Sequence, residues 1–333
     1  MKIRVTSHEG LATFPFDSAG PWSKFKEVFE RSGHKICTLG FEEKCDAIIV
    51  NKINTTVMRY LKYSRIPREK RVLILWEPHV VDKEGFLSEN LQHFGHIYAP
   101  SKSWAKQVKG EFFHWPQDNF MPWRESIIEW QSRSNKAVII QGNKFSAVKG
   151  EEYSLRRKII MKTRDSELDL FGTGWNRGFG PDWFHWSSSF LTNRIKDISL
   201  RSLYNIGRKY SKYGGAVENK HETLQNYKIS IVIENSLDYV SEKLFDAVRA
   251  GCVTIYVGPN LTDYKLNING VFQVMPNGDS VLKKLRELNN LPVEILFSYA
   301  KQSYDFFKKD IDLWENNIVL KNLAKSILLR IAP

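Results

Sequence analysis

The chain has 333 residues, and its 49 Lys and Arg residues against 37 Asp and Glu residues give a formal net charge of +12. Hydrophobic residues make up 42% and charged residues 26% of the sequence, a balance that excludes disordered and collagen-like chains. This length accommodates one large or two medium domains. The basic excess favours a partner with negative charge, such as nucleic acid, an anionic membrane face or a phosphorylated substrate, over plain solubility.

The three cysteines Cys37, Cys45 and Cys252 form neither an even disulfide set nor a CxxC pair. A disulfide framework and a structural zinc site are therefore not expected, and a reducing compartment fits the sequence. The first residues lack the apolar segment of a secretory signal, and no run approaches the ~18 consecutive apolar residues that span a bilayer. We therefore expect a cytoplasmic protein.

Short apolar runs alternate with amphipathic segments through the first 125 residues. The patterning predicts strands at 2–6, 46–50, 71–76 and 96–99, and helices at 21–31, 54–63 and 101–108. A looser stretch rich in Trp and Pro, residues 114–133, is interpreted as a connection between domains. Strands that alternate with helices predict βαβ units and a mostly parallel sheet.

The same alternation restarts after this connection. Strands are predicted at 137–141, 168–171, 228–233 and 252–257, and helices at 152–162, 218–226 and 240–250. The fold class is therefore predicted as α/β, with two domains facing each other across a cleft.

The C-terminal segment Ile318–Ile331 has apolar residues near one helical face, with Lys321, Lys325 and Arg330 among them. One interpretation is a closing helix that packs on the body of the protein. The other is a basic interfacial helix that lies on an anionic membrane. The two interpretations are compatible.

Several common nucleotide and hydrolase motifs are missing. The glycine-rich turn from Gly172 to Gly178 is not GxGxxG, because its third glycine comes one position late, and this disfavours a nicotinamide enzyme. Neither GxxxxGK[ST] nor GxSxG occurs, so a P-loop NTPase is excluded and a serine-hydrolase elbow is absent. The basic, aromatic tract at 183–212 allows nucleic-acid binding, but it matches no standard motif and ranks below a loop that lines a substrate cleft.

The strongest signal lies in the block Tyr227–Pro259. A buried strand ends in Glu234-Asn235, and a short loop leads to Ser241-Glu242-Lys243 at the start of a helix. Ser241 suits the N-cap, and the helix N-terminus together with Lys243 suits an anion. Glu234 and Glu242 have Glu-x7-Glu spacing, which places both near the carboxyl ends of the strands, where α/β sheets bind ligands. The alternative is two surface acids that pair with a lysine.

This block resembles the signature of family 10 glycosyltransferases, the α-1,3/4-fucosyltransferases, in their bacterial form. Ser241 stands where the family usually has Thr, which keeps a hydroxyl group. The matching positions are Tyr227-Lys228, Glu234-Asn235, Tyr239-Val240, Ser241-Glu242-Lys243 and Gly258-Pro259.

Upstream segments are similar to the same family. Asn143-Lys144 resembles the start of the donor domain, and Arg156-Arg157 resembles the arginine-bearing helix before the strand at 169–172. Glu77, in Leu75-Trp-Glu-Pro78, resembles the E-x-P region that holds the proposed catalytic base. The resemblance is detailed over 137–260, thin over 1–135, and adds nothing beyond about 265.

The resemblance implies a GT-B architecture of two Rossmann-like domains. Residues 1–135 would bind the acceptor, residues 136–315 the nucleotide-sugar donor, and residues 316–333 would form the basic amphipathic helix. The implied reaction is an inverting transfer of fucose from GDP-fucose to a hydroxyl of a cell-surface glycan or lipopolysaccharide acceptor. Glu77 would be the base, while Lys243 and Arg156, with Arg157 as the alternative, would neutralise the leaving diphosphate.

The remaining implied donor contacts follow from the same motifs. Glu242 would bind ribose hydroxyls, and Glu234, Asn235 and Tyr239 the donor sugar or ribose. The other implied donor-binding residues are Asn143, Lys144, Gly174 and Ser241. No cofactor is expected, and a metal should be dispensable because side-chain cations supply the positive charge.

Partners and alternatives follow from the same reasoning. The expected partners are a GDP-sugar donor, an oligosaccharide or lipid-linked glycan acceptor and peripheral contact with an anionic membrane, without nucleic acid. Eukaryotic relatives carry an N-terminal membrane anchor, which this sequence does not show, so we expect a cytosolic enzyme or one at the inner face of the cell membrane. The alternatives are transfer from another nucleotide sugar and, in a different class, a basic nucleic-acid-binding protein.

Overall fold

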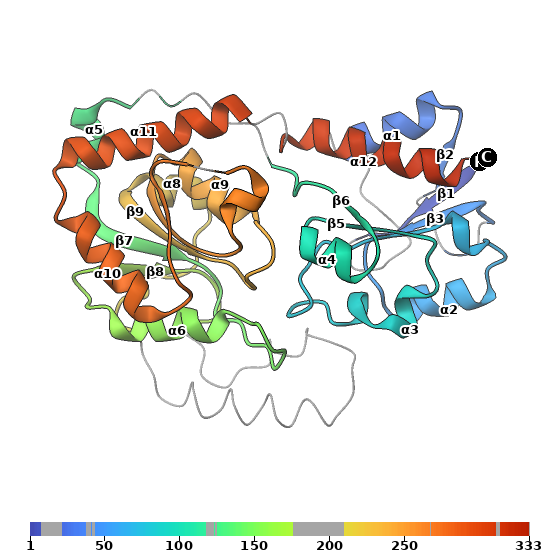
Figure 1. The fold of residues 1–333 in the computed structure, drawn as a ribbon, viewed down its shortest axis with the longest axis horizontal. Coiled ribbons are helices and arrows are strands. Elements are labelled where there is room, and N and C mark those ends of the chain that lie inside the picture. Colours follow the sequence, from blue (N-terminus) through green and yellow to red (C-terminus); the bar gives the residue numbers. More distant parts are fainter. Residues whose placement is uncertain are drawn as a thin grey trace. The chain divides into compact units, whose positions relative to one another are not determined.

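Parallel strands form two sheets in the computed structural model of the chain, one in each of two compact units (Figure 1). Unit 1 comprises Met1–Asn119, Asp238–Val240 and Asp310–Pro333, and unit 2 comprises Phe120–Leu237 and Ser241–Lys309. The structure describes residues 1–7, 22–37, 41, 44–117, 123, 125–175, 210–266, 268–310 and 314–332.

The sheet of unit 1 has the strand order β2-β1-β3-β4-β5-β6, and every neighbouring pair is parallel. Its strands are β1 (Lys2–Val5), β2 (Lys35–Cys37), β3 (Ala47–Val50), β4 (Arg71–Ile74), β5 (His96–Ala99) and β6 (Glu111–Phe112). Its helices are α1 (Trp22–Arg31), α2 (Thr55–Tyr63), α3 (Ser88–Leu91), α4 (Lys102–Gln107) and α12 (Asn316–Ile331), with 3₁₀ turns at Arg68–Lys70 and Glu84–Phe86.

Alternate residues of the unit 1 strands enter two hydrophobic clusters, one on each face of the sheet. Ile49 and Ile74 belong to the cluster that contains residues of α1 and α12, whereas Ile48 and Leu73 belong to the cluster that contains residues of α2 and α4. Both faces of the sheet are therefore covered, as parallel sheets require. Helix α12 contributes Leu320, Leu323, Ala324, Ile327 and Ile331 to this core.

The sheet of unit 2 has the strand order β11-β10-β9-β7-β8, again with parallel neighbours. Its strands are β7 (Ser134–Ile140), β8 (Leu168–Phe171), β9 (Tyr227–Ile233), β10 (Val253–Val257) and β11 (Val271–Gln273). Its helices are α5 (Ile127–Gln131), α6 (Tyr153–Lys162), α8 (Lys220–Gln225), α9 (Glu242–Arg249), α10 (Gly278–Asn289) and α11 (Val293–Asp310), with a 3₁₀ turn at Leu261–Tyr264.

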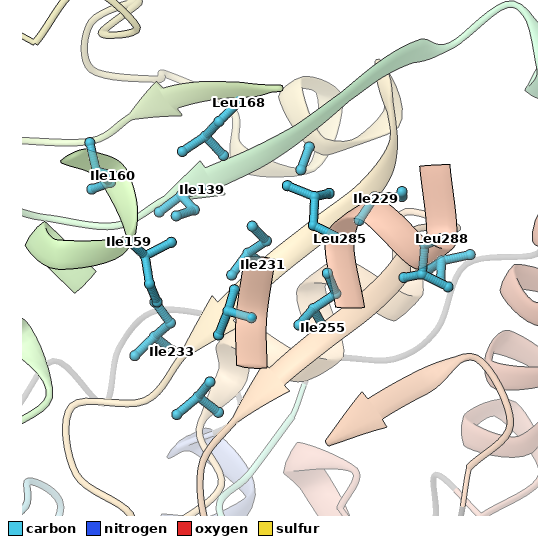
Figure 2. Packing of buried hydrophobic residues seen from close by; sticks show 14 of the residues in the cluster. Ile139, Ile159, Ile160, Leu168, Ile229, Ile231, Ile233, Ile255, Leu285 and Leu288 are labelled. Carbon is cyan, nitrogen blue, oxygen red and sulfur yellow. The ribbon is translucent and has the colours of Figure 1, made fainter. Parts of the chain in front are cut away.

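The core of unit 2 forms where helices α6 and α10 pack against the central strands. Figure 2 shows Ile159 of α6 and Leu285 of α10 beside Ile231 of β9 and Ile255 of β10. All seven residues of β9 and all five of β10 are buried. These central strands set the position of the loops that follow them.

The predicted α/β class is confirmed, and most predicted elements occur within one to three residues of their expected bounds. Strands β2 and β6 were not predicted because runs of three and two residues carry too little periodicity. The predicted helix at 240–250 begins later, at Glu242, because Ser241 caps it. Most of the basic tract at 183–212 lies outside the described residues.

Candidate active site

Glu234 follows β9 directly, and its carboxylate is completely buried. It accepts hydrogen bonds from the Ser241 N–H at 3.0 Å and the Ser241 hydroxyl at 2.6 Å. It also accepts from the Lys243 ammonium at 3.1 Å and the Tyr256 hydroxyl at 3.3 Å. These donors occupy both carboxylate oxygens and offset their negative charge, which a buried carboxylate requires. Glu234 therefore joins the end of β9 to the start of α9.

Lys243 lies in the first turn of α9 with a side chain that is 14% exposed. Its ammonium also donates to the Ser241 hydroxyl at 2.8 Å and lies 4.0 Å from a Glu242 carboxylate oxygen. Burial opposes its charged form, but Glu234 and Glu242 outweigh that effect and raise the pKa of Lys243 above its ordinary value. The side chain of Glu242 is about half exposed. Partial desolvation opposes the charged form of this carboxyl group, but the charges of Lys243 and Lys220 outweigh that effect and hold the pKa of Glu242 below its ordinary value.

Arg156 of α6 is 2% exposed and is held by backbone oxygens at the carboxyl ends of the strands. Its guanidinium donates to the Gly142 carbonyl at 2.9 Å and to the Ile233 carbonyl at 3.1 Å. It also donates to the Asn235 side-chain oxygen at 3.4 Å. Its charge lowers the pKa of Lys243, so the two cations interact electrostatically. Two cations, Lys243 and Arg156, therefore lie at the carboxyl end of β9 together with the carboxylates of Glu234 and Glu242.

Arg157 faces a different set of residues from Arg156. Its guanidinium donates to the Lys144 carbonyl at 2.6 Å and stacks 3.9 Å from the centre of the Phe145 ring. Lys144 itself has an exposed side chain. The sequence left open which of the two arginines faces the donor diphosphate; of the two, Arg156 is the one that interacts electrostatically with Lys243.

The loops after β7 and β8 are joined at Asn143 and Gly174. The Asn143 N–H donates to the Thr173 carbonyl at 2.9 Å, and its side-chain amide donates to the Gly174 carbonyl at 3.1 Å. Gly172 has φ of +123°, and a Cβ there would lie 2.4 Å from the Gln141 carbonyl oxygen. Only glycine fits this close approach without backbone movement.

Tyr239 belongs to unit 1 together with its neighbours Asp238 and Val240. It is 2% exposed, and its ring centre lies 5.0 Å from that of Trp104 and 5.9 Å from that of Trp115. The Asp238 carboxylate accepts from the Trp104 indole N–H at 2.6 Å and lies 3.9 Å from His79 Nδ1. Sequence reasoning missed this His79–Asp238 pair, because its members are far apart in the chain and share no motif.

Glu77 follows β4 in unit 1 and has an exposed side chain. The residues on either side of it, Trp76 and Pro78, are buried, and the Trp76 indole N–H donates to Asn51 at 2.8 Å. This anchoring fixes the backbone at the carboxyl end of the strand, where parallel sheets bind ligands.

Glu152, at the start of α6, is a second residue that the sequence did not single out. Burial, reinforced by the neighbouring Glu151, raises its pKa to about 7. Its N–H donates to the Asn235 carbonyl at 3.0 Å, so it lies beside the Glu234-Asn235 segment. Perturbed carboxyl groups of this kind are common at functional sites.

A metal-binding group and a membrane-spanning helix are both absent from the described residues. Among them, no group of three or more His, Cys, Asp and Glu side chains is arranged to hold a metal ion. No helix within those ranges has the length and apolar character needed to cross a membrane.

Comparisons with known proteins show a glycosyltransferase-like fold. No protein-family model matches the sequence. A fucosyltransferase-like protein of Arabidopsis thaliana is 30% identical in an alignment of 146 residues that covers 38% of this chain and 28% of that protein. The chain therefore matches little more than a quarter of the length of this curated relative.

Solved structures extend the likeness to the whole chain. The Anabaena protein HepE, solved with UDP and glucose, gives a TM-score of 0.56 at 9% identity and covers 98% of this chain and 99% of its own. A glycosyltransferase from Rickettsia africae gives 0.51 at 15% identity and covers 96% and 83%. At these identities the likeness concerns the fold, which is the α/β fold of GT-B glycosyltransferases.

Proposed function

We propose that this chain is an inverting glycosyltransferase that moves fucose from GDP-fucose to a hydroxyl group of a cell-surface glycan or lipopolysaccharide acceptor. The observation that carries the proposal is the buried Glu234–Lys243 pair with Arg156 beside it at the carboxyl end of β9. The two side-chain cations and the helix N-terminus at this edge of the sheet suit a nucleoside diphosphate. The similarity to a fucosyltransferase-like protein supports fucose as the sugar.

The donor diphosphate would be held by the charges at this edge. Lys243 and Arg156 would offset the charge that develops on the leaving GDP, and the amides at the start of α9 would assist. Because the Glu234 carboxylate is buried and already accepts from Ser241, Lys243 and Tyr256, we assign it to holding Lys243 in place. Glu242 is more exposed, which suits contact with ribose hydroxyls.

The acceptor hydroxyl would be deprotonated by Glu77. In this step the acceptor oxygen forms a bond to C1 of the sugar while the bond from C1 to the phosphate oxygen breaks. The hydroxyl proton goes to Glu77, and the electron pair of the broken bond leaves with GDP. A positioned base of this kind contributes about 10²- to 10⁴-fold to the rate. We propose that the two side-chain cations make a metal ion dispensable.

A transfer assay with a matched pair of variants tests this role. Glu77→Gln should remove turnover of GDP-fucose while leaving GDP affinity unchanged. Glu89→Gln, at another exposed acid of unit 1, should retain full activity. Product analysis should show fucose with the anomeric configuration opposite to that of the donor. Loss of GDP binding in Glu77→Gln, or retained configuration, would contradict the mechanism.

A second candidate is transfer from another nucleotide sugar. The shared fold with HepE, which was solved with UDP and glucose, favours this candidate. Competition between GDP and UDP for binding distinguishes the two candidate donors.

We propose that the enzyme lies in the cytoplasm, at the inner face of the cell membrane. Salt-sensitive retention on nucleic acid without nucleotide-sugar binding would instead favour a nucleic-acid-binding protein.

A further inference from the structure

A short segment before α8 extends the sheet of unit 2 beyond β8. The Leu170 N–H donates to the Lys212 carbonyl at 2.9 Å, and the Gly214 N–H donates to the Leu170 carbonyl at 2.8 Å. Leu170 also forms a parallel bridge with Tyr213. Residues 212–214 therefore run beside β8 in the same direction. The residues that come next lie at the carboxyl edge of the sheet, where α/β sheets bind ligands.

Two glycine-containing turns meet at this edge. The N–H of Gly172, directly after β8, donates to the Gly215 carbonyl at 3.0 Å, and the Gly172 carbonyl accepts from the Tyr213 hydroxyl at 2.9 Å. These two bonds hold the turns together. Gly215 has φ of +107°, and a Cβ there would meet no atom within 4 Å. The backbone at Gly215 therefore borders open space, and a glycine backbone allows a flat ligand to approach closely.

Two amide side chains beside these turns have an oxygen atom without a donor. Gln141 is 6% exposed, and its Nε2 donates to the Ile233 carbonyl at 2.8 Å. Asn143 donates from its side chain to the Gly174 carbonyl at 3.1 Å. Within the described part of the chain, the Oε1 of Gln141 and the Oδ1 of Asn143 accept no hydrogen bond. The partial negative charge of such oxygens favours a ligand that presents N–H groups.

Glu218 adds a full negative charge three residues after Gly215. Its side chain is exposed, and it makes no ion pair or hydrogen bond with any residue that the structure describes. The neighbouring acids differ in this respect. Glu222 accepts from the Asn219 side chain at 2.7 Å, and Asp246 pairs with Lys220 at 2.6 Å. The Glu218 carboxylate is therefore available to a ligand at this edge of the sheet.

We propose that Glu218 and the open backbone at Gly215 bind the base of the donor nucleotide and select guanine. Guanine presents its N1–H and its 2-amino group side by side, and the two oxygens of a carboxylate can accept from both. Uracil presents one N–H between two carbonyl oxygens, which a carboxylate repels. The inference rests on the proposed function, because it names the residue that would favour GDP over UDP in the same donor site.

Calorimetric titration of the full chain with GDP, inosine diphosphate and UDP tests this assignment. Inosine diphosphate lacks the 2-amino group, so wild-type protein should bind it about tenfold more weakly than GDP. Glu218→Gln should weaken GDP binding about tenfold or more, because it removes a charged acceptor. The same variant should prefer GDP over inosine diphosphate by less than about threefold.

Glu222→Gln is the matched control, because it removes the same charge from an exposed position four residues further on. Removal of a negative charge near a diphosphate should by itself strengthen binding slightly. A loss of affinity confined to Glu218→Gln would therefore identify a direct contact, and circular dichroism should show both variants folded. Unchanged GDP affinity and unchanged base preference in Glu218→Gln would overturn the inference and leave the GDP site intact. Wild-type protein that binds no GDP, or that prefers UDP, would overturn the proposed GDP specificity together with this inference.

Discussion

Removing the charge of Lys243 alone should destabilise unit 2 far more than removing the charges of Lys243 and Glu234 together. The Glu234 carboxylate is completely buried, and its ion pair with Lys243 measures 3.1 Å. Removing one partner of a buried pair costs about 3–5 kcal/mol, because the other charge remains buried without compensation. Replacing both partners by groups of similar volume is close to neutral. We therefore expect a loss of about 3–5 kcal/mol for Lys243→Met and less than about 1 kcal/mol for Glu234→Gln/Lys243→Met.

Hydrogen exchange measured by mass spectrometry on β9 and β10 reports this difference within unit 2. A loss of 3 kcal/mol or more should accelerate exchange by more than about 100-fold in Lys243→Met. Lys284→Met is the matched control, because it breaks the ion pair with Glu287 on the surface of α10, and surface pairs contribute about 0–1 kcal/mol. A double variant as unstable as Lys243→Met would contradict the reasoning.

The pH dependence of the pair has a defined sign. Since the folded-state pKa of Lys243 is raised, its contribution to stability is complete below the unfolded pKa of lysine, ~10.4. The contribution is lost as pH rises through the folded value. The stability difference between wild type and the double variant should therefore stay constant through neutral pH and change in alkaline solution.

Three further predictions concern Arg133, Gly172 and Glu152 of unit 2. Arg133→Ala should lower the free energy of unfolding in urea by about 3 kcal/mol. Arg133 is only 7% exposed, pairs with Glu125 and donates to the Ala250 carbonyl at 2.8 Å. A loss below about 1 kcal/mol would contradict this prediction. Gly172→Ala should lower the free energy of unfolding more than Gly33→Ala does, as measured by urea unfolding. Both glycines have positive φ, but only at Gly172 would a Cβ collide with a backbone atom. Equal losses of stability in the two variants would argue against the close approach. Glu152 has a pKa raised from 4.5 to about 7, so its protonated form favours folding, and stability should fall as pH rises between these values. Glu152→Gln should abolish that fall in thermal unfolding, and an unchanged pH profile would contradict the assignment.

The elements that the sequence predicted are those with long, regular apolar patterns. Strand β9 reads as a continuous buried run because both of its faces are covered. Strands β8 and β5 match their predicted bounds. The helices α10 and α11 were not predicted, although α10 buries Val281, Leu282, Leu285 and Leu288 at helical spacing. That spacing is a regular helical pattern, so α10 was predictable from the sequence.

The candidate site was only partly predictable for a physical reason. Glu234, Ser241 and Lys243 are close in sequence, so a strand–loop–helix pattern brings them together without knowledge of the fold. The contact of Arg156 with Asn235, by contrast, depends on how α6 packs beside β9. Placement of Tyr239 in unit 1 likewise depends on long-range packing against Trp104. Such contacts leave no local pattern.

Calorimetric titration with GDP, UDP and CMP in the absence of metal tests the proposed GDP-sugar site. We predict selective binding of GDP to wild-type protein. We also predict that GDP affinity is at least tenfold weaker in Glu234→Gln/Lys243→Met, because a charge-assisted hydrogen bond contributes about 1.5–3 kcal/mol. Lys284→Met should bind GDP like wild type. Absence of GDP binding, preference for UDP, or full affinity in the double variant would contradict a GDP-sugar site at Lys243.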